Sequence, residues 1–94
     1  MIFNLNFKSP VFEFTMLPED HLICAVGSNW AGSLKLQILP IASSNPQVWF
    51  DFESVNIISD NYVIVQGFNT RARLLLVGAA ANTVVQGSIN TCPH

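Results

Sequence analysis

The feature that most constrains the fold of this chain is a period-two alternation of apolar and polar residues. The first alternating segment, residues 2–7, reads Ile-Phe-Asn-Leu-Asn-Phe, and the same pattern returns in residues 11–16, 33–39 and 47–52. Successive side chains of a β-strand point to opposite faces, so this alternation is typical of strands with one buried face. Four strands are therefore predicted from the pattern alone.

Turn-forming residues separate these segments and bound further apolar runs. We expect strands also at residues 21–26, 55–58, 62–65, 71–77 and 83–89. The run at residues 21–26 is apolar in both phases, as in a strand covered on both faces. Short strands with turn signals at intervals of about eight to twelve residues indicate a sandwich or barrel.

The fold class predicted is all-β, a single small antiparallel β-sandwich or barrel of jelly-roll or immunoglobulin-like type. Residues 18–94 would form this domain. Residues 1–17, which Pro10 and Pro18 punctuate, would form an N-terminal arm or edge strands. A helix over Arg71–Ala81 is the main alternative, because Leu and Ala favour helices, although Gly78 weakens it.

The composition predicts an assembly partner. Half of the 94 residues are hydrophobic and 11% are charged, against about 25% charged residues in an average soluble domain. A chain this short buries only about 60 to 65% of its unfolded surface, so apolar side chains remain to be covered by other chains. We therefore expect a homo-oligomer, with a trimer favoured.

Membranes and nucleic acid are not expected partners. The longest uncharged apolar stretch, residues 74–81, is shorter than the roughly 20 residues of a membrane span, and the first residues do not resemble a signal peptide. The four basic residues, Lys8, Lys35, Arg71 and Arg73, form no run, whereas nucleic-acid binding needs a basic patch.

Few residues offer catalytic or metal chemistry. Asp51 and Glu53 share a strand face by their spacing, but a solvated face explains them better than a catalytic pair. His21, Cys24, Cys92 and His94 match the ligand types of a zinc site. However, His21 and Cys24 are three apart on a predicted strand and would point to opposite faces. We expect free thiols, no metal, no cofactor and no enzymatic activity, and a Cys24–Cys92 disulfide stays open.

The two tryptophans allow a different class of function. Trp30 or Trp49, with Asp51 and Asn45, could form a stacking platform for a sugar. Both indoles lie next to predicted strands, which favours packing in the core or an interface instead. A glycan-binding or adaptor module of a phage tail or fibre is therefore the alternative function.

The order of motifs resembles small β-sandwich virion proteins of tailed bacteriophages. The shared pattern has a Trp-x-Gly turn, residues 29–32, that leads into the alternating residues 34–37. A Trp-centred strand at residues 48–51, an Arg-bearing strand at residues 71–76 and a last strand at residues 83–89 follow. The resemblance implies a capsid decoration, cement or head-fibre protein that acts in the virion without enzymatic activity. The major capsid protein or another virion protein would be its partner.

The aromatic N-terminal segment is the predicted contact surface. The residues assigned to it, with Trp49 as an additional anchor, are Phe3, Leu5, Phe7, Phe12 and Phe14. If this segment is an arm, deleting residues 1–16 should leave a folded domain that no longer attaches to its partner.

Overall fold

The computed structural model of the protein describes residues 1–41 and 45–92, and its regular elements are all β-strands. The strands are β1 (Ile2–Asn6), β2 (Val11–Met16), β3 (Asp20–Ser28), β4 (Ser33–Leu39), β5 (Phe50–Ile57), β6 (Asn61–Gln66), β7 (Thr70–Val77) and β8 (Val84–Cys92). The all-β prediction is confirmed, and the alternative of a helix over Arg71–Ala81 is wrong, because strand β7 occupies most of that segment. Within the described ranges, no helix could span a membrane.

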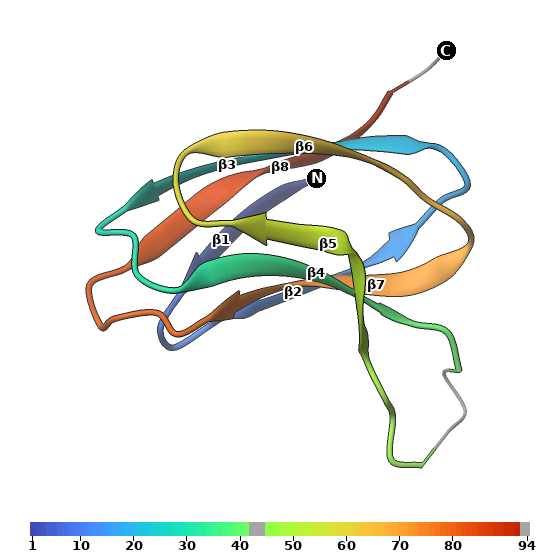
Figure 1. Ribbon diagram of the computed structural model, residues 1–94, viewed down its shortest axis with the longest axis horizontal. Coiled ribbons are helices and arrows are strands. Elements are labelled where there is room, and N and C mark those ends of the chain that lie inside the picture. Colours follow the sequence, from blue (N-terminus) through green and yellow to red (C-terminus); the bar gives the residue numbers. More distant parts are fainter. Residues whose placement is uncertain (42–44, 93–94) are drawn as a thin grey trace.

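The strands form two antiparallel four-stranded sheets that pack as a sandwich (Figure 1). Sheet A has the order β1-β8-β3-β6, and sheet B has the order β2-β7-β4-β5. Strand β1 pairs with β8, β2 with β7, β3 with β6 and β4 with β5. These nested pairings are those of one long hairpin rolled into two layers, which is the jelly-roll arrangement among the predicted sandwich types.

The core lies between the two sheets and receives side chains from every strand. Its most deeply buried members include Phe3, Met16, Ile23, Leu34, Leu36, Leu74, Val85 and Ile89. The alternation that the sequence shows in β1, β2 and β4 matches their burial patterns. Period-two patterning therefore placed the inward faces of these strands correctly.

The N-terminal arm is not confirmed. Strand β1 pairs along its whole length with β8, and β2 pairs along its whole length with β7. Both strands are the edges of their sheets. The first turn of the chain is tight, because the Asn6 side-chain oxygen accepts the backbone N–H groups of Lys8 and Ser9. This segment of the chain is part of the sandwich.

A β-bulge joins two segments that the sequence pattern separates. Residues 47–52 and 55–58 are predicted as two strands, but β5 runs through both patterns as one strand. Glu53 and Ser54 have positive φ angles of 56° and 51°, and the register against β4 shifts between Lys35 and Gln37. A bulge of this kind breaks the alternation without ending the strand.

Candidate interaction surface

The two sheets differ sharply in charge. Asp20 is the only Asp, Glu, Lys or Arg in the four strands of sheet A. The strands of sheet B contain Glu13, Lys35, Asp51, Glu53, Arg71 and Arg73. The outer face of sheet B is called the charged face below, and that of sheet A the uncharged face.

Side chains of the charged face bind one another across three strands. Arg73 Nε donates to Gln37 Oε1 at 2.8 Å, and Gln37 Nε2 donates to Asp51 Oδ1 at 2.9 Å. Lys35 Nζ lies 3.7 Å from the other carboxylate oxygen of Asp51. The Arg73 guanidinium also stacks 4.3 Å from the ring centre of Trp49, a cation–π contact. This network fixes polar groups that face solvent.

A second ion pair extends the charged face to its edge. Arg71 Nη2 lies 2.7 Å from Glu13 Oε2 and joins β7 to the edge strand β2. Exposed pairs of this kind contribute only about 0 to 1 kcal/mol. Their main effect is a hydrated face that protects the edge of sheet B from pairing with another strand.

An apolar stripe occupies one half of the uncharged face. It consists of Leu22, Cys24 and Val26 of β3 with Tyr62 and Ile64 of β6. Leu22 lies opposite Ile64 and Cys24 opposite Tyr62 in the antiparallel register. Tyr62 is 62% exposed, Ile64 59% and Val26 53%. These large side chains are solvated in the isolated chain, and the one charged residue in the strands of this sheet, Asp20, lies beside the row of Leu22 and Ile64 at the end of β3.

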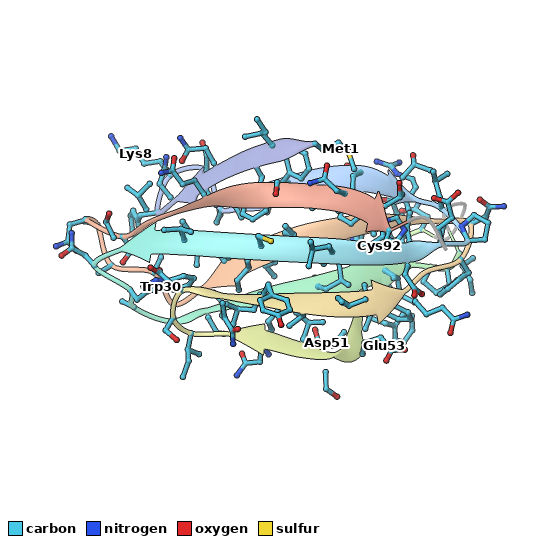
Figure 2. All side chains as sticks on the ribbon, turned by 90° about the horizontal axis from the view of Figure 1, so that it is seen from above. Met1, Lys8, Trp30, Asp51, Glu53 and Cys92 are labelled. Carbon is cyan, nitrogen blue, oxygen red and sulfur yellow. The ribbon has the colours of Figure 1, made fainter. Side chains whose placement is uncertain are left out.

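Neutral polar side chains fill the other half of the uncharged face. On β1 and β8 these outward residues are Asn4, Asn6, Gln86, Ser88 and Asn90, interspersed with Ile2 and Val84. Ile2 is 83% exposed. Figure 2 looks onto this sheet: the labelled Lys8 lies beyond the end of β1, and the labelled Asp51 and Glu53 lie along β5. Charges therefore border the uncharged face and do not interrupt it.

The predicted contact residues of the N-terminal segment are mostly inside the sandwich. Phe3, Leu5 and Phe14 are buried in the core, and Phe12 is half-buried. The rings of Phe3 and Phe12 lie 6.1 Å apart, and those of Phe12 and Phe14 lie 6.2 Å apart. Phe3, Leu5 and Phe14 cannot meet a partner while this fold is intact. In the isolated chain Phe3, Leu5 and Phe14 thus belong to the core, and Phe12 packs against it.

Phe7 and Trp49 remain accessible. Phe7 is 57% exposed and, with Lys8 and Val84, lines a shallow cleft at the end of the uncharged face. Trp49 is half-buried beside Arg73, on the charged side of the molecule. Their role in binding a partner stays a prediction, and the structure does not bring the two residues together.

The sequence pattern does not predict the apolar stripe, although a signal for it exists. Residues 21–26 and 62–65 are apolar in both phases, and this pattern predicts that residues 21–26 form a strand covered on both faces. The structure covers only the inward phase of each, with Ile23 and Val65 buried. One apolar phase of these two strands therefore stays accessible in the isolated chain, with Val26, Tyr62 and Ile64 exposed.

Trp30 is half-buried and is held by contacts within the fold. Its Nε1–H donates to Asp60 Oδ1 at 2.9 Å, and the Gly27 backbone N–H donates to the same oxygen at 2.8 Å. The indole packs so closely on Gly27 that a side chain there would collide with it. The Trp-x-Gly turn of the sequence pattern therefore ties the β3–β4 connection to the β5–β6 turn.

This tie predicts a specific pH dependence of stability. The hydrogen bonds from the Gly27 N–H and the Trp30 indole lower the pKa of Asp60 below its ordinary value. The ionised carboxylate thus stabilises the fold above the unfolded pKa of about 3.9, and this contribution is lost as the pH falls through the lower folded pKa. Asp60→Asn should be less stable than wild type at pH 7, and the difference should shrink at pH 2 to 3. Urea denaturation at both pH values measures it, and equal differences at the two would contradict this role.

The candidate metal ligands do not converge. The His21 side chain is buried, with Nε2 3.1 Å from the Leu17 carbonyl oxygen, whereas Cys24 points outward. Cys24 and Cys92 are free thiols, and His94 lies outside the described residues. Among the residues that the structure describes, no three His, Cys, Asp or Glu side chains gather to hold a metal ion.

The two carboxylates considered for catalysis are both exposed. Asp51 is held by Gln37 and Lys35, and Glu53 sits in the bulge of β5.

No protein family model matches the chain, and the comparison with curated proteins gives no match either. The protein is thus a jelly-roll domain with one charged face and one uncharged face. The contrast between these two faces is its most distinctive surface feature.

Proposed function

We propose that this protein is a non-enzymatic assembly protein whose uncharged face is covered by another protein chain. The observation that carries the proposal is the contrast between the two faces: six charged residues lie in the strands of sheet B and one in those of sheet A. The centres of protein interfaces are depleted in charge, because burying an unpaired charge is costly. Covering the exposed side chains of Tyr62, Ile64 and Val26 would remove apolar surface from water, which favours association.

The narrower proposal is a structural protein of a phage particle, a decoration or cement protein that bridges capsid subunits. Its support is the resemblance of the motif order to small virion proteins, together with the jelly-roll arrangement, which occurs in viral capsid proteins and also in lectins and cupins. In this role many copies would each bind weakly and together stabilise a shell through multivalency. Chemistry at a catalytic centre is not required.

A pair of matched substitutions tests whether the uncharged face binds a partner. Ile64→Lys places a charge on the exposed face of edge strand β6, and Val11→Lys places one on the charged side of edge strand β2. The tagged protein would be co-expressed with the products of its neighbouring genes. We expect the Ile64 variant to bind its partner at least tenfold more weakly, because burying a lysine ammonium costs free energy that Asp20, one row away, offsets only in part, and the Val11 variant to bind as wild type does.

Thermal unfolding supplies the control for this experiment. Both substitutions are at solvated positions, so both variants should unfold within a few degrees of wild type. If a partner is captured equally well by both variants, the uncharged face does not bind it and the proposal fails. Equal loss in both variants, with the fold intact, would place the contact elsewhere.

A further inference from the structure

We propose that the uncharged face is covered by the same face of a second copy, in a two-fold, face-to-face dimer. This inference rests on the proposed function, because it names the partner of the surface described above. It commits to a closed pair, whereas the sequence-based expectation is a homo-oligomer with a trimer favoured. Three properties of sheet A support a second copy as the partner: its register, the near absence of charge in its strands, and its size.

The outward side chains of sheet A form parallel rows across the strands. The central row reads Ile2, Ser88, Cys24 and Tyr62, one residue from each strand. Two rows lie on each side of it. The adjacent rows are Asn4, Gln86 and Val26 on one side and Asn90, Leu22 and Ile64 on the other; the outermost rows are Asn6, Val84 and Ser28, and Cys92, Asp20 and Gln66.

On the two central strands, β8 and β3, a two-fold axis along the central row matches like chemistry with like. Such an axis lies in the plane of the interface and brings each row over the row on the opposite side of the centre. Val26 then meets Leu22 of the second copy, and Gln86 meets Asn90. Apolar groups pack on apolar groups, and an amide can both donate to and accept from another amide.

The lack of charge suits a second copy in particular. In a two-fold contact, a charged group on the axis meets its own copy and is repelled. Asp20 is the only charged residue in these strands, and it lies in an outermost row, which the same axis brings over the row of Ser28 in the second copy. The two copies of Asp20 are therefore at opposite ends of the interface. The network of the charged face, in contrast, already pairs its groups within one chain.

The size of the face is sufficient for a reversible dimer. Strands β1, β8, β3 and β6 have 5, 9, 9 and 6 residues, which at about 3.3 Å per residue and about 4.8 Å between strands gives a projected area of roughly 460 Å². The shortest dimension of the molecule, 20 Å, agrees with four strands side by side. Accessible area exceeds projected area, but the face stays below the roughly 800 Å² per partner of a standard interface, which suits a weak, concentration-dependent dimer.

Pairing between sheet edges is a less favourable way to associate. Figure 2 shows β5 beyond β6 when sheet A is viewed from above, and β5 carries Asp51 and Glu53. A strand added to β6 would meet this acidic strand. The opposite edge, β1, has only five residues, and the N–H of Asn6 already donates to the Ser9 carbonyl. Short, charged or occupied edges are the usual protection against edge pairing.

The central row contains a thiol, Cys24, that can be cross-linked to test the dimer. Cys24 lies on the proposed axis, so the two Cys24 thiols of a dimer would face each other across sheets about 10 Å apart. In a Cys92→Ser variant, a short bis-maleimide should therefore join two chains through Cys24. The Cys24→Ser, Cys92→Ser double variant is the control and should give no covalent dimer.

Tyr62, on the same row, allows a charge-exchange test on the full chain. Light scattering after size exclusion should give twice the 10.4 kDa of the chain for wild type. Tyr62→Lys and Tyr62→Glu should each dissociate at concentrations at least tenfold above that of wild type, because each places like charges together at the axis. An equimolar mixture of the two should restore the dimer, which a misfolded variant could not do.

The outcomes separate this inference from the proposed function. A wild-type chain that stays monomeric at millimolar concentration, or variants at Tyr62 that dimerise as wild type does, would overturn the two-fold dimer. If Ile64→Lys still loses a captured partner in that case, the uncharged face binds a different protein and the proposed function stands. If the mixed Tyr62 variants dimerise again while Ile64→Lys captures another protein as wild type does, the two-fold dimer stands and that protein binds outside the uncharged face.

Discussion

A chain that lacks residues 1–16 is expected to lose cooperative folding. The deletion removes β1 and β2, which pair with β8 and β7 at the edges of the two sheets. It also removes four buried side chains, those of Phe3, Leu5, Phe14 and Met16. Burying one side chain of this size is worth about 1.5 to 3 kcal/mol, so the four together approach the roughly 5 to 15 kcal/mol by which a small domain is stable.

Urea denaturation followed by circular dichroism measures this loss, and two single substitutions give the matched control. Phe3→Ala should cost about 3 to 5 kcal/mol, because Phe3 fills the core. Phe7→Ala should change stability by no more than about 0.5 kcal/mol, since Phe7 is exposed. A truncated chain with a cooperative transition near that of wild type would show that the N-terminal strands are dispensable and would restore the interpretation of this segment as an arm.

The truncation also bears on how binding is tested. If residues 1–16 are needed for folding, a truncated chain that fails to bind says nothing about its contact residues. Substitutions at exposed positions such as Phe7 and Ile64 leave the core intact and separate the two effects. Attachment is therefore better tested residue by residue than by removing the segment.

The strands could be predicted from the sequence because their alternation reflects a local property of the backbone. In residues 2–7, Phe3, Leu5 and Phe7 share one phase, which predicts that all three are buried on the same face of the strand. The structure separates them because β1 ends at Asn6, whose side chain accepts the N–H groups of the next turn. Phe7 leaves the sheet plane there and becomes exposed. A single turn thus decides which aromatic residues belong to the core.

The pairing of strands could not be predicted, because it depends on contacts between distant segments. Residues 2–6 pair with residues 84–88, and no local pattern specifies that register. The uncharged face follows from the same pairing. Composition predicted that apolar surface would remain exposed, but only the assignment of β1, β8, β3 and β6 to one sheet shows where it lies.

The fold of sheet A is expected to depend strongly on Gly87. On the inner side of this sheet, Phe3, Gly87 and Ala25 lie side by side on β1, β8 and β3. A Cβ atom at Gly87 would collide with the carbonyl oxygen of Cys24 and would lie 2.9 Å from Phe3 Cζ. The bulky ring of Phe3 fits over the sheet because its two neighbours in the row have almost no side chain.

Gly87→Ala should therefore lower the free energy of unfolding by about 2 to 3 kcal/mol, in the upper range of overpacking substitutions. For a domain of this size, that corresponds to a decrease in Tm of about 10 to 20 °C. Ser88→Ala, the next position on β8, is half-buried on the outer face and should change the Tm by only a few degrees. Thermal unfolding by circular dichroism compares the two variants directly.

A second substitution identifies which contact limits the space. Phe3→Leu replaces the ring that would meet the new methyl group with a shorter side chain, but it leaves the Cys24 carbonyl in place. We expect Phe3→Leu to recover little of the stability lost in Gly87→Ala, because the backbone of β3 must still move. Full recovery of the lost stability would show that the Phe3 ring alone causes the steric clash.

Gly87 adjoins Ser88 of the central row, so a shift of β8 against β3 would also disrupt the two-fold face. Gly87→Ala should lose stability and dimerisation together, whereas Tyr62→Lys should lose only dimerisation.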